Sequence, residues 1–286
     1  MSLLAFFKVC TMEWITGLKL TAQGGIAAYK HRYYIQEYFV KAKALLNIGK
    51  TQIIVTGLPS AGKSMLVGQM HGRARELYHE APGESKSVEV DAITLGEWTK
   101  LVRVLPGQVG YRVQGELEAF VANEALEGLI HVVDFGYSGP RDQILAGELI
   151  RKDGLDTIEK LRSRNLDREL EALKLELANV RKLLSGENNF KWIVIAVNKI
   201  DLFGDKLESA LAHYHPGGSS PFSKELRDFQ SAVGSNNVKI YVAKTCASED
   251  DFVWANEVVK SSLGHNAQRE NLRDFMKTIS LILRDA

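Results

Sequence analysis

The stretch "QIIVTGLPSAGKSMLVGQM", residues 52–70, decides the fold. An apolar run leads into Gly57-x-x-x-x-Gly62-Lys63-Ser64, and a segment with helical character follows. A strand, a glycine-rich loop and a helix in this order are the context that a phosphate-binding loop requires. Gly57 and Gly62 permit backbone angles that aim successive N–H groups at phosphate oxygens. The stretch therefore predicts an α/β protein that binds the phosphates of a nucleotide.

Each polar residue of this loop has a predicted task. The helix that begins near Lys63 adds the partial positive charge of its N-terminus. Lys63 would neutralise the β- and γ-phosphates, and the Ser64 hydroxyl would bind Mg²⁺. The predicted nucleotide contacts of the loop are Gly57, Ser60, Ala61, Gly62, Lys63, Ser64 and Met65.

The composition narrows the protein class. The chain has 286 residues, of which 45% are hydrophobic and 25% charged, and its net charge of +1 gives no reason to expect a nucleic acid as partner. Its two cysteines, Cys10 and Cys246, match no metal-binding spacing, so we expect a reducing, cytoplasmic location. The apolar start "MSLLAFFKVC" lacks a basic region and a cleavage site, and no apolar run has the length of a membrane-spanning helix.

Outward from the loop, strand and helix patterns alternate. Several strands are continuously apolar, as in a mostly parallel sheet that is covered on both faces. "SVEVDAITLGEWTKLVRVL" is the exception, because two strands joined by a short turn predict a hairpin and one antiparallel edge strand. The predicted strands are 52–57, 87–95, 99–105, 129–136, 192–199 and 238–244, and the predicted helices are 63–79, 115–126, 141–185, 222–233 and 267–284.

The long helical segment carries one apolar stripe. Its members recur at alternating intervals of four and three residues, and they are Leu166, Leu170, Leu173, Leu177, Val180 and Leu184. The stripe is compatible with a coiled-coil partner, but it is under three heptads long, and packing against the sheet is the preferred interpretation.

A second motif indicates which base is bound. "WIVIAVNKIDLF" places Asn198-Lys199-Ile200-Asp201 at the end of an apolar strand, where ligands bind in open α/β sheets. Together with the phosphate loop, this motif resembles P-loop GTPases of the Ras-like superfamily. The resemblance implies that the Asp201 carboxylate accepts from guanine, that the Lys199 stem covers the base, and that Asn198 braces the loops. Adenine offers no matching pair of donors.

A third segment resembles the same superfamily. Thr245-Cys246-Ala247-Ser248 is similar to the Thr-Cys-Ala-Thr loop of heterotrimeric G-protein alpha subunits. By that resemblance the Ala247 N–H meets guanine O6. Cys246 would pack beside the base and would not be a nucleophile.

The metal-sensing segments depart from the family pattern. The family carries Asp-x-x-Gly at the end of the third strand, where this chain has Val104-Leu-Pro-Gly107-Gln108. By resemblance Gly107 would contact the γ-phosphate and Gln108 would orient the attacking water, but Val104 cannot hold a water on Mg²⁺. The threonine of the first switch is also missing, and either Ser85 or Ser87 would replace it. We assign Ser87 to the metal beside Ser64.

Asp134 in "LIHVVDFG" is an alternative source of the missing acid. It ends an apolar strand, as the metal-binding Asp of many nucleotide hydrolases does. The preferred interpretation is structural, because the string resembles the strand of ADP-ribosylation-factor-like GTPases that ends in Val-Val-Asp without touching Mg²⁺.

Residues 1–50 lie outside the resemblance. They are predicted to form a helical extension that precedes a GTPase domain over 51–286, which is itself enlarged by helices at about 137–190. The extension mixes aromatic residues with Lys and Arg, so it could pack on the domain, bind a partner protein, or lie peripherally on a membrane surface.

The sequence thus predicts a three-layer α/β P-loop fold with a six-stranded sheet and a GTP/GDP switch that uses Mg²⁺. Lys63, Gly107 and Gln108 would act in a slow or partner-dependent hydrolysis of GTP, and an effector or regulatory protein would be the partner. The alternative is a non-catalytic GTP-binding module, which Val104 favours. A P-loop kinase or ATPase fits less well, because Asn-Lys-Ile-Asp has no use for adenine.

Overall fold

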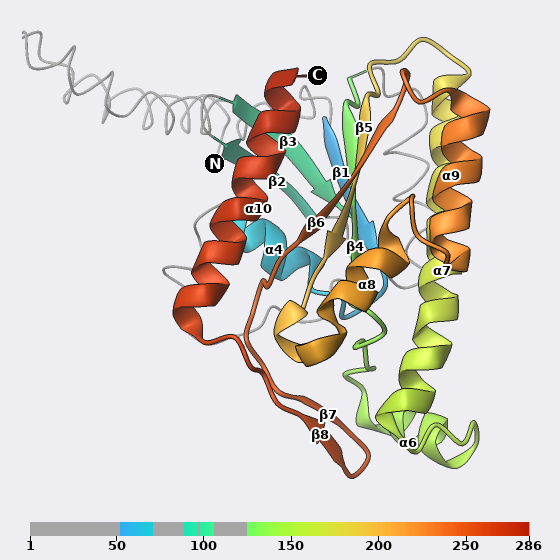
Figure 1. The fold of residues 1–286 in the computed structure, drawn as a ribbon, viewed down its shortest axis with the longest axis vertical. Helices are drawn as coiled ribbons and strands as arrows, with labels where there is room; N and C mark the ends of the chain where they lie inside the picture. Colours follow the sequence, from blue (N-terminus) through green and yellow to red (C-terminus); the bar gives the residue numbers. More distant parts are fainter. Residues whose placement is uncertain (1–51, 71–88, 96–97, 106–124, 286) are drawn as a thin grey trace, which may run out of the picture.

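A six-stranded sheet forms the centre of the protein (Figure 1). The structure is a computed structural model, and it describes residues 52–70, 89–95, 98–105 and 125–285. The strand order is β2-β3-β1-β4-β5-β6. The strands are β1 (Ile53–Gly57), β2 (Glu89–Leu95), β3 (Trp98–Val104), β4 (Gly128–Val133), β5 (Trp192–Val197) and β6 (Lys239–Lys244).

The predicted hairpin at the edge of the sheet is confirmed. β2 pairs antiparallel with β3, with Glu89 opposite Val104 and Leu95 opposite Trp98. All other pairs are parallel: β1 with β3 and β4, β4 with β5, and β5 with β6. The three central strands β1, β4 and β5 are buried on both faces, which explains why they are almost continuously apolar in the sequence.

Helices cover both faces and complete three layers (Figure 1). On one face α4 (Lys63–Met70) and α10 (His265–Asp285) pack against alternate strand residues such as Ile53 and Val55. On the other face α7 (Ile158–Leu184), α8 (Leu207–Tyr214) and α9 (Pro221–Val233) pack against residues such as Ile54 and Ile193. The predicted three-layer α/β architecture with a mostly parallel, six-stranded sheet is therefore confirmed.

The apolar stripe of the long helical segment packs on the sheet, as preferred over a coiled coil. Leu173, Leu177 and Val180 of α7 are fully buried in the core beneath β4 and β5. The prediction of one helix over 141–185 is wrong, because the segment forms α6 (Gln143–Arg151) and α7. Gly154 has a φ of +68° between them, and Thr157 caps the start of α7 by accepting from Lys160 N–H.

Two parts of the fold, a short helical segment and a small hairpin, were not predicted from the sequence. α8 follows two short 3₁₀ turns, η2 (Ile200–Leu202) and η3 (Gly204–Lys206). A small hairpin of β7 (Phe252–Trp254) and β8 (Glu257–Val259) follows the loop after β6. It is attached to the start of α7, because Trp254 Nε1–H donates to Leu155 O at 2.6 Å and Ile158 N–H to the Glu257 carboxylate at 2.7 Å.

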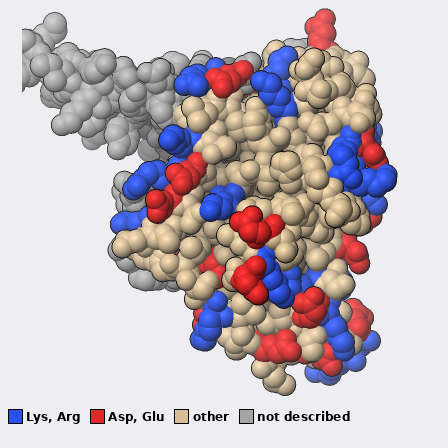
Figure 2. Space-filling model, viewed as in Figure 1, with Lys and Arg blue, Asp and Glu red and all other residues tan. Residues whose placement is uncertain are grey.

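Charged side chains of both signs are intermingled over the face shown in Figure 2, around a broad uncharged area. Within the described ranges, every helix is too short or too polar to cross a membrane. The predicted helical extension 1–50, the helix 115–126 and the end of the helix 63–79 lie almost wholly outside the described residues.

Candidate nucleotide-binding site

Four loops meet at one edge of the sheet. They follow β1, β4, β5 and β6, which are consecutive in the sheet and run parallel to one another. The carboxyl ends of these strands therefore lie along the same edge. The loops span residues 58–62, 134–138, 198–201 and 245–248. This edge is where ligands bind in open α/β sheets.

Backbone conformations that are rare for residues other than glycine occur in three of these loops. Ser60, Phe135 and Lys199 have φ values of 63°, 54° and 59°. Such left-handed conformations cost energy and persist where surrounding contacts hold them, often at binding sites. The edge is therefore held in a defined shape by its own contacts.

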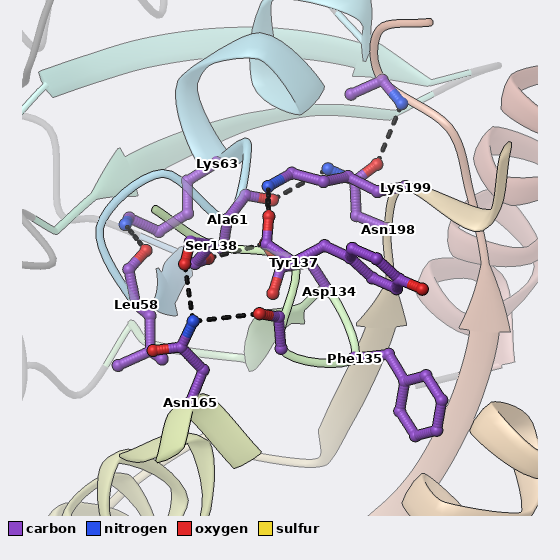
Figure 3. A network of polar contacts seen from close by, with 12 residues as sticks. Leu58, Ala61, Lys63, Asp134, Phe135, Tyr137, Ser138, Asn165, Asn198 and Lys199 are labelled. Atoms are coloured by element: carbon purple, nitrogen blue, oxygen red, sulfur yellow. Dashed lines mark hydrogen bonds and ion pairs between the residues drawn. The ribbon is translucent and has the colours of Figure 1, made fainter. Parts of the chain in front are cut away.

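The loop after β1 curls around the Lys63 side chain (Figure 3). Lys63 begins α4 and donates from Nζ to Gly57 O at 3.1 Å and to Leu58 O at 2.8 Å. Gly57 has a φ of +138°, and a Cβ at this position would lie 2.2 Å from Val132 O. The close approach of β4 therefore requires glycine here, and the buried ammonium group lies within the loop.

Asn198 joins its own loop to the phosphate loop and to the loop after β6. Its Nδ2–H donates to Ala61 O at 2.8 Å, and its Oδ1 accepts from Ala247 N–H at 2.9 Å. Both hydrogen bonds are buried and join residues far apart in the chain. The Ala247 N–H that was assigned to guanine O6 is thus engaged by Asn198, so contact with O6 would require that bond to be shared.

Asp201 has one carboxylate oxygen without a partner. The Asp201 side chain is buried, and Cys246 Sγ lies 3.2 Å from its Oδ1. Its Oδ2 has no partner in hydrogen-bond geometry among the described residues, although the Ser261 hydroxyl lies close enough to lower the Asp201 pKa. Burial raises the pKa of Asp201. Burial and then the nearby Asp201 carboxylate raise the pKa of the Cys246 thiol, so the thiol stays protonated. A protonated thiol that donates to Asp201 agrees with a packing role for Cys246.

Lys199 is anchored in the loop after β4. Its Nζ donates to Asp134 Oδ2 at 2.6 Å and to Tyr137 O at 2.5 Å (Figure 3). Ser138 Oγ–H donates to the same Asp134 oxygen at 2.6 Å. Asp134 therefore neutralises the lysine of the Asn-Lys-Ile-Asp motif, and this supports the structural interpretation of Asp134 over a metal-binding one.

Side chains of helix α7 hydrogen bond to the backbone of the loop 134–138. Asn165 Nδ2–H donates to Gly136 O at 2.9 Å and to Ser138 O at 2.5 Å. Arg162 Nε–H donates to Phe135 O at 3.1 Å, and its guanidinium lies over the Phe135 and Tyr137 rings at 4.6 and 4.7 Å.

Glu169 completes this support from one turn further along α7. One oxygen accepts from the N–H groups of Asp134 and Gly136, each at 3.2 Å, and the other accepts from the Tyr214 hydroxyl. Burial, followed by the nearby Asp134 charge, raises the pKa of Glu169 to about 8. Glu169 is therefore mostly protonated at neutral pH, and the Asp134 side chain, which also pairs with Lys199, is the acceptor beside its proton.

The third strand ends in an apolar contact. Val104, which the sequence resemblance placed at the position of a metal-linked Asp, is 2% exposed and belongs to the same buried apolar cluster as Leu66 and Val67 of α4. Ser64 lies in the first turn of α4. Within the described ranges, His, Cys, Asp and Glu form no group of three that could hold a metal ion. Ser87, Gly107 and Gln108 lie outside the described residues.

We compared the chain with known proteins. No protein-family model and no curated protein matches the sequence. Among the similar solved structures, a mammalian SRP receptor is 14% identical with a TM-score of 0.47, and the match covers 81% of this chain and 99% of that chain. A bacterial selenocysteine-specific elongation factor, EF-Sec, is 15% identical with a TM-score of 0.40, and the match covers 83% of this chain but only 29% of that one. We therefore infer the function from the residues of the site.

The supporting residues of α7 were missed in the sequence. Arg162, Asn165 and Glu169 continue the spacing of Leu173, and their side chains are buried on the same face of the helix. The signal was the run of three polar residues at helical spacing, directly before the apolar stripe. Because polar residues are usually solvated, only their burial reveals that they hold a loop.

Proposed function

We propose that the protein is a guanine-nucleotide switch that binds GTP and GDP at the edge of the sheet formed by the four loops. The observation that carries the proposal is the buried Asp201, whose Oδ2 has no partner in hydrogen-bond geometry among the described residues and whose loop Asn198 joins to the phosphate loop. A buried carboxylate oxygen without a donor is unfavourable, and a ligand that supplies donors removes this cost.

Guanine has the donors that this carboxylate lacks. Its N1–H and 2-amino groups lie side by side and would both point at Asp201. The Lys199 stem would lie over the ring, and Cys246 would pack beside it. Adenine presents an unprotonated N1 at the same edge, so an adenine nucleotide would leave the carboxylate without donors and would bind less tightly.

The phosphates would occupy the loop between β1 and α4. The Lys63 ammonium group and the N-terminus of α4 place positive charge there. Mg²⁺ is usually bound by one or two protein groups together with phosphate oxygens and water, so the Ser64 hydroxyl suits a metal that the nucleotide brings with it. Ser87 is the proposed second hydroxyl.

Hydrolysis is proposed to be slow or dependent on a partner. Lys63, Gly107 and Gln108 would act on the γ-phosphate, but the buried Val104 offers no group to the water shell of the metal. Val104 equally favours the second candidate, a non-catalytic module in which GTP orders a surface for an effector or regulatory protein.

Equilibrium binding tests the proposal. We expect fluorescent GDP and GTP, with Mg²⁺, to bind the purified full-length chain at least tenfold more tightly than the ADP and ATP analogues. Lys63→Ala should weaken binding, because it removes the charge within the phosphate loop. Lys224→Ala, at an exposed position of α9, is the matched control and should bind as the wild type does. Equal affinity for ADP and GDP would refute guanine selection.

Multiple-turnover phosphate release then separates the two candidates. Release from GTP that is lost in the Lys63→Ala variant would support a hydrolase without the third-strand Asp. A sample that binds GTP but releases no phosphate would support the non-catalytic module, or a switch that needs a partner for turnover.

A further inference from the structure

We propose that Asp134 is a positioning residue for the guanine base. It acts by anchoring the Lys199 side chain that lies over the base, and it thereby sets how long the nucleotide stays bound. The inference rests on the proposed guanine-nucleotide binding. It assigns to Asp134 a role that is neither metal binding nor simple core packing.

The first support is the contact itself. Asp134 is fully buried, whereas the Lys199 side chain is 20% exposed and extends from the base-recognition loop toward Asp134. Asp134 Oδ2 accepts from Lys199 and Ser138, and Glu169 is a further side chain hydrogen bonded to Asp134, so Lys199 is the cation that offsets the buried charge. The cost of leaving such a charge unpaired holds Lys199 in place.

The second support is the conformation of Lys199. It lies at the start of η2 with a φ of 59° and ψ of 35°, between Asn198 and Asp201. A free lysine side chain loses considerable rotamer entropy when a ligand fixes it. Because Asp134 and the Tyr137 carbonyl already fix the far end of the stem, the stem is ordered before the base arrives.

The third support is the rigidity of the anchor. Asn165 and Glu169 of α7 hold the backbone of the loop 134–138 at Asp134, Gly136 and Ser138. A carboxylate on an unsupported surface loop could follow a moving lysine, but this one is fixed to a 27-residue helix. The position of Lys199 is therefore determined by the core of the domain.

The test is a double-mutant cycle on nucleotide dissociation. Asp134→Asn keeps the side-chain shape and an acceptor for Ser138, and Lys199→Met keeps an unbranched apolar stem. The release of fluorescent GDP is followed after addition of excess unlabelled GDP. We expect Asp134→Asn to speed release on the order of tenfold, the effect of losing one charge-assisted hydrogen bond. Asp134→Asn should have little further effect in the Lys199→Met background.

Thermal melting of the nucleotide-free variants provides a second measurement. Lys199→Met leaves the buried Asp134 without its cation and should lower the melting temperature, and adding Asp134→Asn should restore it. Asp228→Asn is the matched control, because Asp228 forms an exposed pair with Lys224 at the same distance of 2.6 Å, and GDP release should not change.

Three outcomes are decisive. If wild-type protein binds no guanine nucleotide, the proposed function itself fails. If wild type binds GDP but Asp134→Asn releases it at the wild-type rate, the positioning role is refuted and the function stands. If Asp134→Asn speeds release equally with and without Lys199, its effect does not pass through Lys199, and the inference is also refuted.

Discussion

Replacing Asn198 by alanine removes a side chain that is hydrogen bonded to both the phosphate loop and the loop after β6. Two buried hydrogen bonds are lost, from Nδ2 to Ala61 O at 2.8 Å and from Ala247 N–H to Oδ1 at 2.9 Å. Each leaves a buried backbone group unpaired, which typically costs about 1–3 kcal/mol, so we expect the free energy of unfolding to fall by roughly 2–5 kcal/mol.

The assay is urea unfolding of nucleotide-free protein, followed by circular dichroism and tryptophan fluorescence. Asn236→Ala is the matched control, because Asn236 is exposed in the turn after α9, and we expect a change within about 0.5 kcal/mol. GDP affinity of Asn198→Ala should also fall, because the phosphate loop and the base loop are no longer joined. A change in unfolding free energy as small as that of the control would refute the view that Asn198 holds the site together.

Three further predictions concern other residues of the site. Between pH 4.5 and 8, folded wild-type protein keeps the Glu169 proton, because its pKa is about 8, whereas the unfolded chain loses it near 4.5. The wild-type free energy of unfolding should therefore decrease by up to about 1.4 kcal/mol per pH unit in this range. Glu169→Gln has no such proton, so its free energy of unfolding should fall less with pH. Urea unfolding at pH 6 and 7.5 measures the free energy of unfolding of both proteins. An equal change between the two pH values in wild type and in Glu169→Gln would contradict the raised pKa. Val104→Asp should lower the free energy of unfolding, measured in urea, by about 3 kcal/mol, because it buries a carboxylate in an apolar cluster. In this variant Mg²⁺ should slow GDP release more than it does in wild type. An unchanged response to Mg²⁺ would show that residue 104 is not beside the metal. Gly62→Ala should weaken GDP binding about tenfold or more, since the φ of Gly62 is +92° and a Cβ there would lie 2.3 Å from Asn198 Nδ2. Gly68→Ala is the control and should bind GDP normally, because a Cβ at Gly68 would meet nothing within 4 Å. Equal GDP affinities of the two variants would argue against the close contact at Gly62.

The sequence predicted those parts that depend on local pattern. Continuous apolar runs predicted the central strands β1, β4 and β5, and the hairpin of β2 and β3 followed from its short turn. The division between α6 and α7 was missed, although Asp142, Gly154 and Thr157 are typical of helix ends. A long stretch of favourable helical spacing hid these signals.

The contacts between loops could not be predicted in the same way. The bracing by Asn198 was implied by resemblance, but the pairing of Lys199 with Asp134 joins residues 65 positions apart and depends on how β4 and β5 pair. Glu169 also has no local signature, because a glutamate in a helix is usually solvated. Such partners become visible only when the sheet brings the loops together.

Guanine recognition by Asp201 is the central claim, and an exchange of base specificity tests it most directly. Xanthine has a carbonyl where guanine has its 2-amino group, so an amide at residue 201 would donate where the carboxylate accepts. We expect Asp201→Asn to weaken GDP binding on the order of a hundredfold and to gain xanthosine diphosphate, whereas Asp205→Asn, at an exposed position, keeps the wild-type preference. Unchanged GDP affinity in Asp201→Asn would contradict the claim.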